Sequence, residues 1–192
     1  MNNFGDSRSV DLKNKLCYNH FNKFQLIQVP KMIRKANINE LNEILEIYAY
    51  ARGFMAQNGN PTQWGNTTPK KELLIENIND GLLYVVEEYG ELQGVFYFSL
   101  ENDPTYDVIK DGSWLSDKPY GVIHRIASAG KKKGVLKTCI EFCLERTNHI
   151  RIDTHENNTV MHHLLSKYGF SKRGIIFLQN GDERIAYEYI KL

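Results

Sequence analysis

The chain has 192 residues, 42% of them hydrophobic and 24% charged, and its formal net charge is +1. This length suits one domain with a real core, and the small charge gives no general attraction to nucleic acid or to an anionic membrane. The three cysteines do not form a disulfide framework, and the first residues lack the apolar stretch of a signal peptide. No apolar run approaches the roughly 18 residues of a membrane span. We therefore expect a soluble, cytoplasmic protein with no nucleic-acid or membrane partner.

Residues 1–31 differ from the rest of the chain. They are rich in Asn, Lys and Ser, show no sustained period, and carry five Lys/Arg against Asp6 and Asp11, a net +3. A chain that began at Met32 would start directly on a strand. We interpret residues 1–31 as a non-core arm, whose native status we leave open, before a domain of residues 32–192. A basic arm that binds nucleic acid or a partner is the alternative.

From Met32 onward the hydrophobic pattern predicts regular elements. Strands are expected at 32–36, 82–88, 92–100, 120–128, 149–154, 174–179 and 184–190. Helices are expected from an Asn37 or Asn39 cap to Arg52, and at 69–78, 131–146 and 157–168. Residues 101–119 are read as a loop or insertion. The resulting order, β-α-α-β-β-β-α-β-α-β-β, predicts a mixed α/β sheet domain.

The segment IHRIASAGKKKGVLKTCIEF, residues 123–142, is a buried strand, a turn with three lysines between two glycines, and an amphipathic helix. Unpaired N–H groups and the positive end of a helix dipole allow such a turn to bind a phosphate. The spacing matches neither a P-loop nor G-x-G-x-x-G. A solvated lysine turn is therefore the alternative.

Two segments together resemble the GCN5-related N-acetyltransferase (GNAT) family. VIHRIASAGKKKGVLKTCIEFCLER is similar to the family's strand–loop–helix that holds the pyrophosphate of acetyl-CoA. NNTVMHHLLSKYGF is similar to the family's Asn…Leu-Tyr-x-x-x-Gly-Phe helix ending. The resemblance spans nearly all of the chain after residue 31. It implies a mixed, mostly antiparallel central sheet of about seven strands with flanking helices, whose fourth and fifth strands splay apart around the pantetheine arm.

The resemblance also implies acetyl-CoA as the co-substrate and a set of residues that bind it. Backbone N–H groups around Gly134 would hold the pyrophosphate, a backbone N–H near Ile126 or Ala127 would polarise the thioester carbonyl, and Asn158 matches a family asparagine that touches the cofactor. The implied cofactor-binding residues are Ile126, Ala127, Ser128, Lys131, Lys132, Lys133, Gly134, Val135 and Asn158.

Two positions depart from the family pattern. Leu136 stands where a small residue is usual, so its side chain would either push against the phosphate or point into the core. Leu165 stands at the position of the tyrosine that often protonates the leaving thiolate. Tyr168, three residues later, is a candidate acid, with a packing aromatic at the helix end as the alternative.

Candidate bases lie on the two strands expected to splay. His124 and His155 are candidates because an imidazole titrates near neutral pH. The alternatives are a hydrogen-bonded core histidine for His124 and a surface or capping residue for His155. Because side chains alternate along a strand, Arg125 is expected to face the opposite side of the sheet from His124.

The acceptor site is expected among aromatic and polar residues of the loops. Gln63 and Trp64 lie in the loop between the first two helices, and Trp114 and Tyr120 flank the insertion. All four are candidate substrate contacts, with packing as the alternative for each.

No metal site is expected. His155-Glu156 does not begin an H-E-x-x-H motif, and Cys139 and Cys143 share an apolar helix face that is typical of core cysteines. Neither cysteine is placed as a nucleophile. The sequence predicts an N-acetyltransferase that moves an acetyl group from acetyl-CoA to a primary amine of a small molecule or peptide, by direct attack in a ternary complex. A non-catalytic CoA-binding or sensing module is the alternative, and a homodimer is left open.

Overall fold

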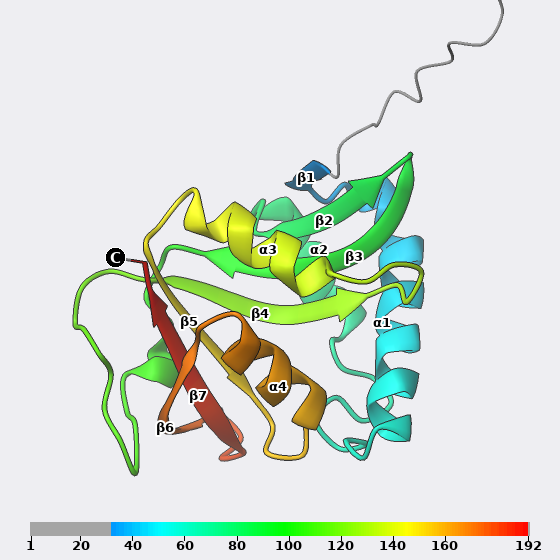
Figure 1. The fold of residues 1–192 in the computed structure, drawn as a ribbon. Helices are drawn as coiled ribbons and strands as arrows, with labels where there is room; N and C mark the ends of the chain where they lie inside the picture. The colour runs from blue at the N-terminus through cyan, green and yellow to red at the C-terminus, as the bar shows by residue number, and fades with distance from the viewer. Residues whose placement is uncertain (1–31, 192) are drawn as a thin grey trace, which may run out of the picture. The chain divides into compact units, whose positions relative to one another are not determined.

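The computed structural model describes residues 32–191, and a seven-stranded sheet organises them (Figure 1). The strands are β1 (Met32–Lys35), β2 (Leu83–Glu88), β3 (Glu91–Ser99), β4 (Gly121–Ser128), β5 (His149–Thr154), β6 (Ser171–Phe177) and β7 (Glu183–Ile190). Their order is β1-β2-β3-β4-β5-β7-β6, and every pair is antiparallel except β4–β5, which is parallel. The expected mixed sheet is confirmed. The arm expected at residues 1–31 lies outside the described residues.

The helices cover both faces of the sheet. They are α1 (Leu41–Gln57), α2 (Lys71–Asn79), α3 (Val135–Leu144) and α4 (Thr159–Lys167), with short 3-10 turns η1 (Ile38–Glu40) and η2 (Pro104–Tyr106). Figure 1 shows α3 and α4 in front of the sheet, with α1 and α2 behind it. The predicted order of strands and helices is confirmed. Within the described residues, no helix is both long and apolar enough to cross a bilayer.

Local signals explain where some helices begin. Asn37 forms a capping box with Glu40, because its side chain accepts from Asn39 N at 2.9 Å and Glu40 accepts from Asn37 N at 2.7 Å. The predicted end of α1 at Arg52 was wrong, since the helix continues to Gln57. The predicted start of α3 at Lys131 was also wrong. Gly134 has φ 89°, which a right-handed helix does not contain, so the three lysines belong to the preceding turn.

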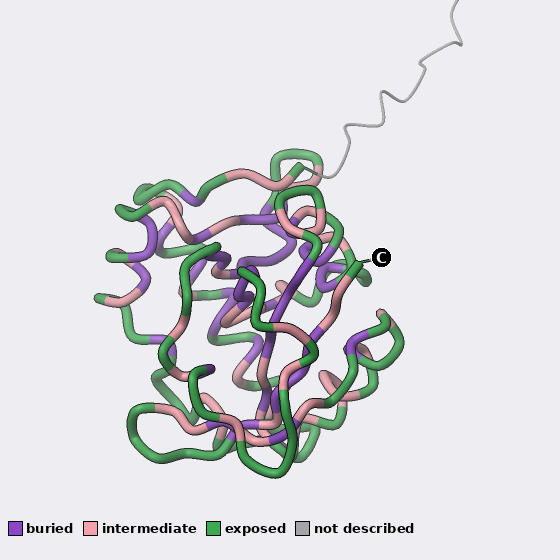
Figure 2. Tube along the Cα trace, turned by 90° about the vertical axis from the view of Figure 1, so that its left-hand side faces the viewer, coloured by how far each residue is buried: buried purple, intermediate pink, exposed green. Residues whose placement is uncertain are grey.

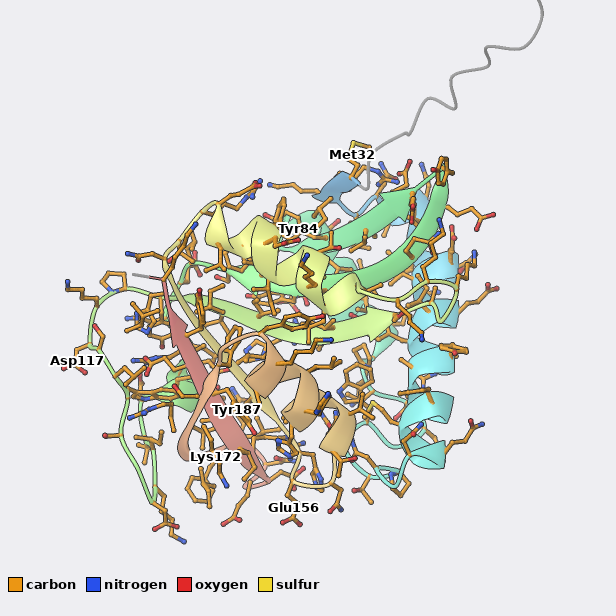
Figure 3. The ribbon with its side chains drawn as sticks, in the orientation of Figure 1. Met32, Tyr84, Asp117, Glu156, Lys172 and Tyr187 are labelled. Carbon is orange, nitrogen blue, oxygen red and sulfur yellow. The ribbon has the colours of Figure 1, made fainter. Side chains whose placement is uncertain are left out.

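Two apolar layers hold these elements together. One lies between the sheet and α3 and α4, and the other lies between the sheet and α1 and α2. Figure 2 shows the buried segments running through the middle of the molecule, with exposed turns around them. Figure 3 labels Tyr84 of β2, which packs on Phe142 of α3 with ring centroids 5.2 Å apart, and Tyr187 of β7, whose hydroxyl lies 2.8 Å from His162 of α4. The alternating side chains of the strands supply both layers.

The sheet opens between β4 and β5. Their pairing consists of Gly121 with Ile150, Val122 with Arg151 and Ile123 with Ile152. Beyond Ile123, β4 continues beside β3 while β5 continues beside β7. In Figure 1 the two strands diverge, and α4 lies in front of the space between them. The splay expected from the family resemblance is therefore present.

Candidate functional site

A cleft of about 680 Å³ opens where β4 and β5 separate. Its walls come mainly from four segments of the chain: residues 62–68 between α1 and α2, 123–126 of β4, 152–154 of β5, and 178–184 around the β6–β7 turn. The wall is mixed in character, with hydroxyl, amide, carboxylate and guanidinium groups between apolar side chains. A concave site of this size, with a few converging polar groups, is typical of a small-molecule site.

A β-bulge in β4 shapes this wall. Tyr97 pairs with His124 and Val95 pairs with Ala127, so two residues of β4, Arg125 and Ile126, stand opposite one residue of β3. Arg125 adopts φ 52°, which is uncommon for a residue other than glycine. Bulges of this kind re-aim side chains and are frequent beside active sites.

The bulge places His124 and Arg125 on the same face of the sheet. The guanidinium carbon of Arg125 lies 4.6 Å from the centroid of the Tyr97 ring, and the imidazole centroid of His124 lies 5.9 Å from it. The expectation that these two side chains face opposite sides was wrong, because the extra residue breaks the alternation at this point. Both side chains line the cleft.

His124 lies between two carboxylates. Its Nε2 is 2.7 Å from Asp103 Oδ2 and its Nδ1 is 3.4 Å from Asp153 Oδ1. Asp153 also accepts a hydrogen bond of 2.9 Å from the hydroxyl of Tyr106, a buried residue of η2. Asp103 is held in turn by Thr105, whose backbone N–H and hydroxyl both donate to it.

Electrostatics favour the protonated form of His124. Burial alone would lower the pKa of His124, but hydrogen bonds and the negative charges of Asp103 and Asp153 outweigh it, so the pKa is raised above 6.5. Burial would raise the pKa of Asp103, but the hydrogen bonds from His124 and Thr105 lower it well below its usual range. Burial, followed by the charge of Asp153, raises the pKa of Tyr106. The two carboxylates therefore favour the imidazolium form of His124, and only the neutral form of His124 can accept a proton.

The turn between β4 and α3 carries three exposed lysines and ends at Gly134. Gly134 caps the helix at φ 89°, and Leu136 packs into the core with only 7% of its surface exposed. The side chain of Leu136 therefore points inward. Lys131 pairs with Glu91 at 3.2 Å and Lys132 with Glu88 at 2.9 Å, across to the β2–β3 hairpin. The N–H groups of the first turn of α3 remain the natural contact for an anion.

Three of the expected residues line the cleft from outside β4. Asn158 caps α4 by accepting from Met161 N at 3.2 Å, and it donates to Gln63 Oε1 at 3.0 Å. Trp64 packs edge-to-face on the buried Tyr48, with ring centroids 5.6 Å apart. Gln63, Trp64 and Asn158 all line the cleft.

Four expected residues lie outside the cleft lining. His155 accepts from Asn157 N at 3.2 Å within a turn, and Tyr168 ends α4 and packs against the core beneath it. Trp114 and Tyr120 lie on either side of Arg151, with its guanidinium carbon 4.0 Å and 3.9 Å from the two ring centroids. The contacts of His155 are those of a surface or capping residue. The contacts of Tyr168, Trp114 and Tyr120 are those of packing aromatic residues.

The remaining expected residues lie along β4 and the turn that follows it. Ile126 lines the cleft, Ala127 is buried, and Ser128 Oγ accepts from Gly130 N at 3.1 Å. Val135, the first residue of α3, is buried against Gly94 of β3. Lys133 is exposed on the turn.

Sequence reasoning missed several members of the site. Asp103, Tyr97 and Tyr106 reach the cluster from β3 and the insertion, and Asp182 and Arg184 reach the cleft from the β6–β7 turn. The Asp103-Pro104 pair signals a turn, but no local pattern connects it with His124, 21 residues away. Only the folded sheet brings these groups together.

Neither metal ligation nor thiol chemistry has support in the described part of the chain. No group of three or more His, Cys, Asp and Glu side chains is placed to hold a metal ion between residues 32 and 191. Cys139 and Cys143 are fully buried, and burial raises the pKa of the Cys143 thiol far above its usual range. A thiol in that state is a poor nucleophile.

Comparison with known proteins places this site in a family. No family model matches the sequence, and no curated protein matches it. A GNAT-family acetyltransferase from Streptococcus agalactiae 2603 is 30% identical, with a TM-score of 0.77 over 86% of this chain and 98% of that one. The chain belongs to the GNAT family.

Two other solved structures share the GNAT fold at lower identity. A GNAT-family acetyltransferase from Listeria monocytogenes 4b F2365 is 19% identical, with a TM-score of 0.61 over 83% of this chain and 94% of that one. YncA from Salmonella typhimurium, solved with its cofactor acetyl-CoA, is 15% identical, with a TM-score of 0.53 over 83% of this chain and 93% of that one.

In this GNAT protein the two departures from the family pattern, Leu136 and Leu165, are both core residues.

Proposed function

We propose that this GNAT protein transfers an acetyl group from acetyl-CoA to a primary amine within a ternary complex. The observation that carries the proposal is the continuity of β4. Residues 124–126 of this strand have no partner on β5 and form one wall of the cleft. The same strand leads directly into the glycine turn and the N-terminus of α3. A cofactor bound along this edge would have its phosphates at one end and its thioester at the other.

The chain offers a binding group for each part of acetyl-CoA. The N–H groups of residues 133–136 suit the pyrophosphate because they lie at the positive end of α3. The backbone of residues 124–128, which lacks a β5 partner, suits the amide groups of the pantetheine arm. The N–H of Ile126 or Ala127 would polarise the thioester carbonyl, as the family resemblance implies. The finding that YncA was solved with acetyl-CoA supports this assignment.

The cluster around His124 suits the amine. An ammonium group bound beside Asp103 and Asp153 would compete with the imidazolium for their negative charge, which lowers the pKa of His124 toward its ordinary value. His124 can then lose its proton to solvent and accept one from the ammonium. The neutral amine attacks the thioester carbon, the tetrahedral intermediate collapses, and the C–S bond breaks. The released thiolate takes its proton from water, since Leu165 carries none and Tyr168 is outside the cleft lining.

Calorimetric titration with acetyl-CoA tests the cofactor site. Gly134→Pro should abolish measurable binding, because proline cannot adopt φ 89° and lacks an N–H. Gly59→Pro is the matched control: it places the same strain at φ 82°, in the turn after α1. We expect Gly59→Pro to lower the melting temperature while acetyl-CoA still binds. Unchanged affinity in a folded Gly134→Pro variant would contradict the assignment.

Thiol release and product mass test the transfer step. Acetyl-CoA should be consumed only when an amine acceptor is present, with one CoA thiol released per N-acetyl product. Tight binding of acetyl-CoA without transfer to any amine would favour a non-catalytic CoA-binding module, for which the buried Leu165 at the family's tyrosine position is the supporting observation.

A further inference from the structure

Arg125 is a guanidinium that the protein leaves incompletely partnered in the cleft wall. Its Nη2 donates to Asn77 Oδ1 at 2.6 Å, and its guanidinium carbon lies 4.6 Å from the centroid of the Tyr97 ring. Its Nε is buried without a hydrogen-bond partner. Among residues 32–191, no carboxylate lies within ion-pair distance of it. The remaining nitrogen, Nη1, makes no hydrogen bond within residues 32–191, and it is not among the buried side-chain atoms that lack a partner.

This arrangement is costly for the free protein. Transfer of a guanidinium out of water is unfavourable unless an anion or several acceptors replace its hydration. Burial lowers the pKa of Arg125, which is the signature of a cation whose desolvation is not fully offset. The strained backbone at φ 52° nevertheless holds the side chain in this position. Strain retained at a cleft wall indicates a function there.

The charged side chains of the cleft do not all balance one another. The group of Asp103, Asp153 and His124 has excess negative charge, and Arg125 has no carboxylate partner among the described residues. Three carboxylates and three cationic side chains line it. Arg184 and Asp182 pair with each other at 3.7 Å. Asp103 and Asp153 both lie at His124, so this part of the cluster carries more negative than positive charge even when His124 is protonated. Arg125 keeps one net positive charge.

We propose that the acceptor is a small amino acid, a molecule that carries its amine and a carboxylate a few bonds apart. Its ammonium group would bind beside Asp103 and Asp153, and its carboxylate would bind the free side of the Arg125 guanidinium. The guanidinium carbon of Arg125 and the imidazole centroid of His124 lie 4.6 Å and 5.9 Å from the centroid of the Tyr97 ring, and both side chains line the same cleft. The charges of Asp103 and Asp153 also act on Arg125, which places the two half-sites within electrostatic range of each other. This inference rests on the proposed function and narrows its acceptor.

Other amines fit the charges less well. A polyamine would bring a second cation next to Arg125, where like charges repel. An amine without a carboxylate would leave Arg125 as it is in the free protein. A peptide N-terminus carries its amine far from its carboxylate and offers Arg125 only neutral carbonyl groups, which bind a cation more weakly than a carboxylate does.

Binding to the CoA-saturated protein tests the inference without turnover. The probes are the twenty common L-amino acids and β-alanine, each paired with its own carboxamide, together with putrescine. We expect at least one amino acid to bind about tenfold or more tightly than its carboxamide, since a charge-assisted bond contributes on this scale. The inference is overturned if no amino acid binds, or if every amino acid that binds does so no better than its carboxamide.

Variants then assign the preference to Arg125. Arg125→Gln should reduce the acid-to-amide affinity ratio to about threefold or less, because the amide side chain keeps polarity and loses the charge. Arg146→Gln, at the end of α3 and outside the cleft lining, should keep the wild-type ratio. A folded Arg125→Gln variant that keeps the full ratio overturns the assignment. If that variant does not fold, Arg125→Lys replaces it and should give an intermediate ratio, whereas an unchanged ratio overturns the assignment.

The transfer assay separates this inference from the proposed function. If an amino acid binds with the expected preference but releases no thiol from acetyl-CoA, the binding inference stands and the proposed catalysis fails. If putrescine or the carboxamides are acetylated as efficiently as every amino acid, the catalysis stands and the inference is overturned.

Discussion

Two clusters of histidine, carboxylate and arginine lie on neighbouring strands of the same sheet. The cleft cluster is His124, Arg125, Asp103 and Asp153. The inner cluster is His149, Arg151 and Glu188, where the fully buried Glu188 accepts from His149 Nε2 at 2.6 Å, from Arg151 Nε at 3.1 Å and from the backbone N–H of Leu115. The same chemical groups therefore occur twice, in different surroundings.

The two clusters differ in how many protein groups pair with their charged side chains. In the inner cluster Glu188 has His149 Nε2, Arg151 and a backbone N–H as hydrogen-bond partners, and Arg173 Nε lies 3.8 Å from it. The guanidinium carbon of Arg151 lies 4.0 Å and 3.9 Å from the ring centroids of Trp114 and Tyr120. This arrangement fastens residues 114–120 to β5 and β7. In the cleft cluster Arg125 has no carboxylate partner among the described residues, and His124 lines an open cavity. The comparison teaches that a carboxylate matched by basic partners inside the core holds structure, whereas a cation with no carboxylate partner beside a cavity suits ligand binding.

The largest expected effect is on stability, in the inner cluster. Glu188→Gln should lower the free energy of unfolding by about 3–5 kcal/mol, because it leaves Arg151 buried without a negative partner. Urea unfolding followed by circular dichroism measures this. Glu183→Gln, exposed on the same strand, is the control and should change stability by less than about 0.5 kcal/mol. A loss below about 1 kcal/mol in Glu188→Gln would break the comparison, since the inner cluster would then not hold structure.

The second effect is on catalysis, in the cleft cluster. His124→Gln should lower kcat/KM for the amine acceptor about 100-fold or more, the usual contribution of an acid–base residue. Its effect on the unfolding free energy should be smaller than that of Glu188→Gln, because His124 already has access to the cleft. The measurements are thiol release and urea unfolding on the same preparation. Full activity in a folded His124→Gln variant would remove His124 from the mechanism.

The third effect is a shift of the pH–rate profile. Asp103 raises the pKa of His124 through a hydrogen bond and its negative charge, and the proposed base must be neutral to accept a proton. The rising limb of kcat/KM against pH should therefore lie above pH 6.5 in the wild type and move to lower pH in Asp103→Asn. Asp182→Asn, which removes the partner of Arg184 instead, should leave the midpoint in place.

The smallest effect concerns stability against pH. Because the pKa of His124 is higher in the folded state than its ordinary 6.5, its contribution is fully present below that pH. The contribution is lost as pH rises through the folded-state pKa. The difference in unfolding free energy between the wild type and His124→Gln should thus be larger at about pH 6 than at about pH 9. A difference that grows toward high pH would mean that His124 is not the protonated partner of the two carboxylates.

The local signals in the sequence predicted the elements and their order, but not every helix end. Alternating apolar residues marked the strands and Asn37 was one of two candidate caps for the first helix, whereas the third helix was predicted to start at Lys131, before Gly134. These signals act over a few residues, and so they can be read from the chain directly. The family resemblance added the splay of β4 and β5, which is confirmed, and a direction for the cofactor, which stays a prediction.

Local sequence signals could not predict which side chains come together in the cleft. The bulge at Arg125 depends on the register between β3 and β4, and it reversed the expected orientation of this side chain. Asp103 reaches His124 only because the insertion after β3 folds back over the sheet. Trp114 and Tyr120, expected at the substrate, surround Arg151 instead.

The sequence by itself therefore determined the order of the elements, the family and the turn that suits a phosphate, because each depends on residues that are neighbours in the chain. Only the tertiary structure decided which histidine lies between two carboxylates, and that Arg125 stands in the cleft wall with no carboxylate of residues 32–191 at ion-pair distance. Both depend on charges brought together from distant segments, and on how completely the folded chain pairs them.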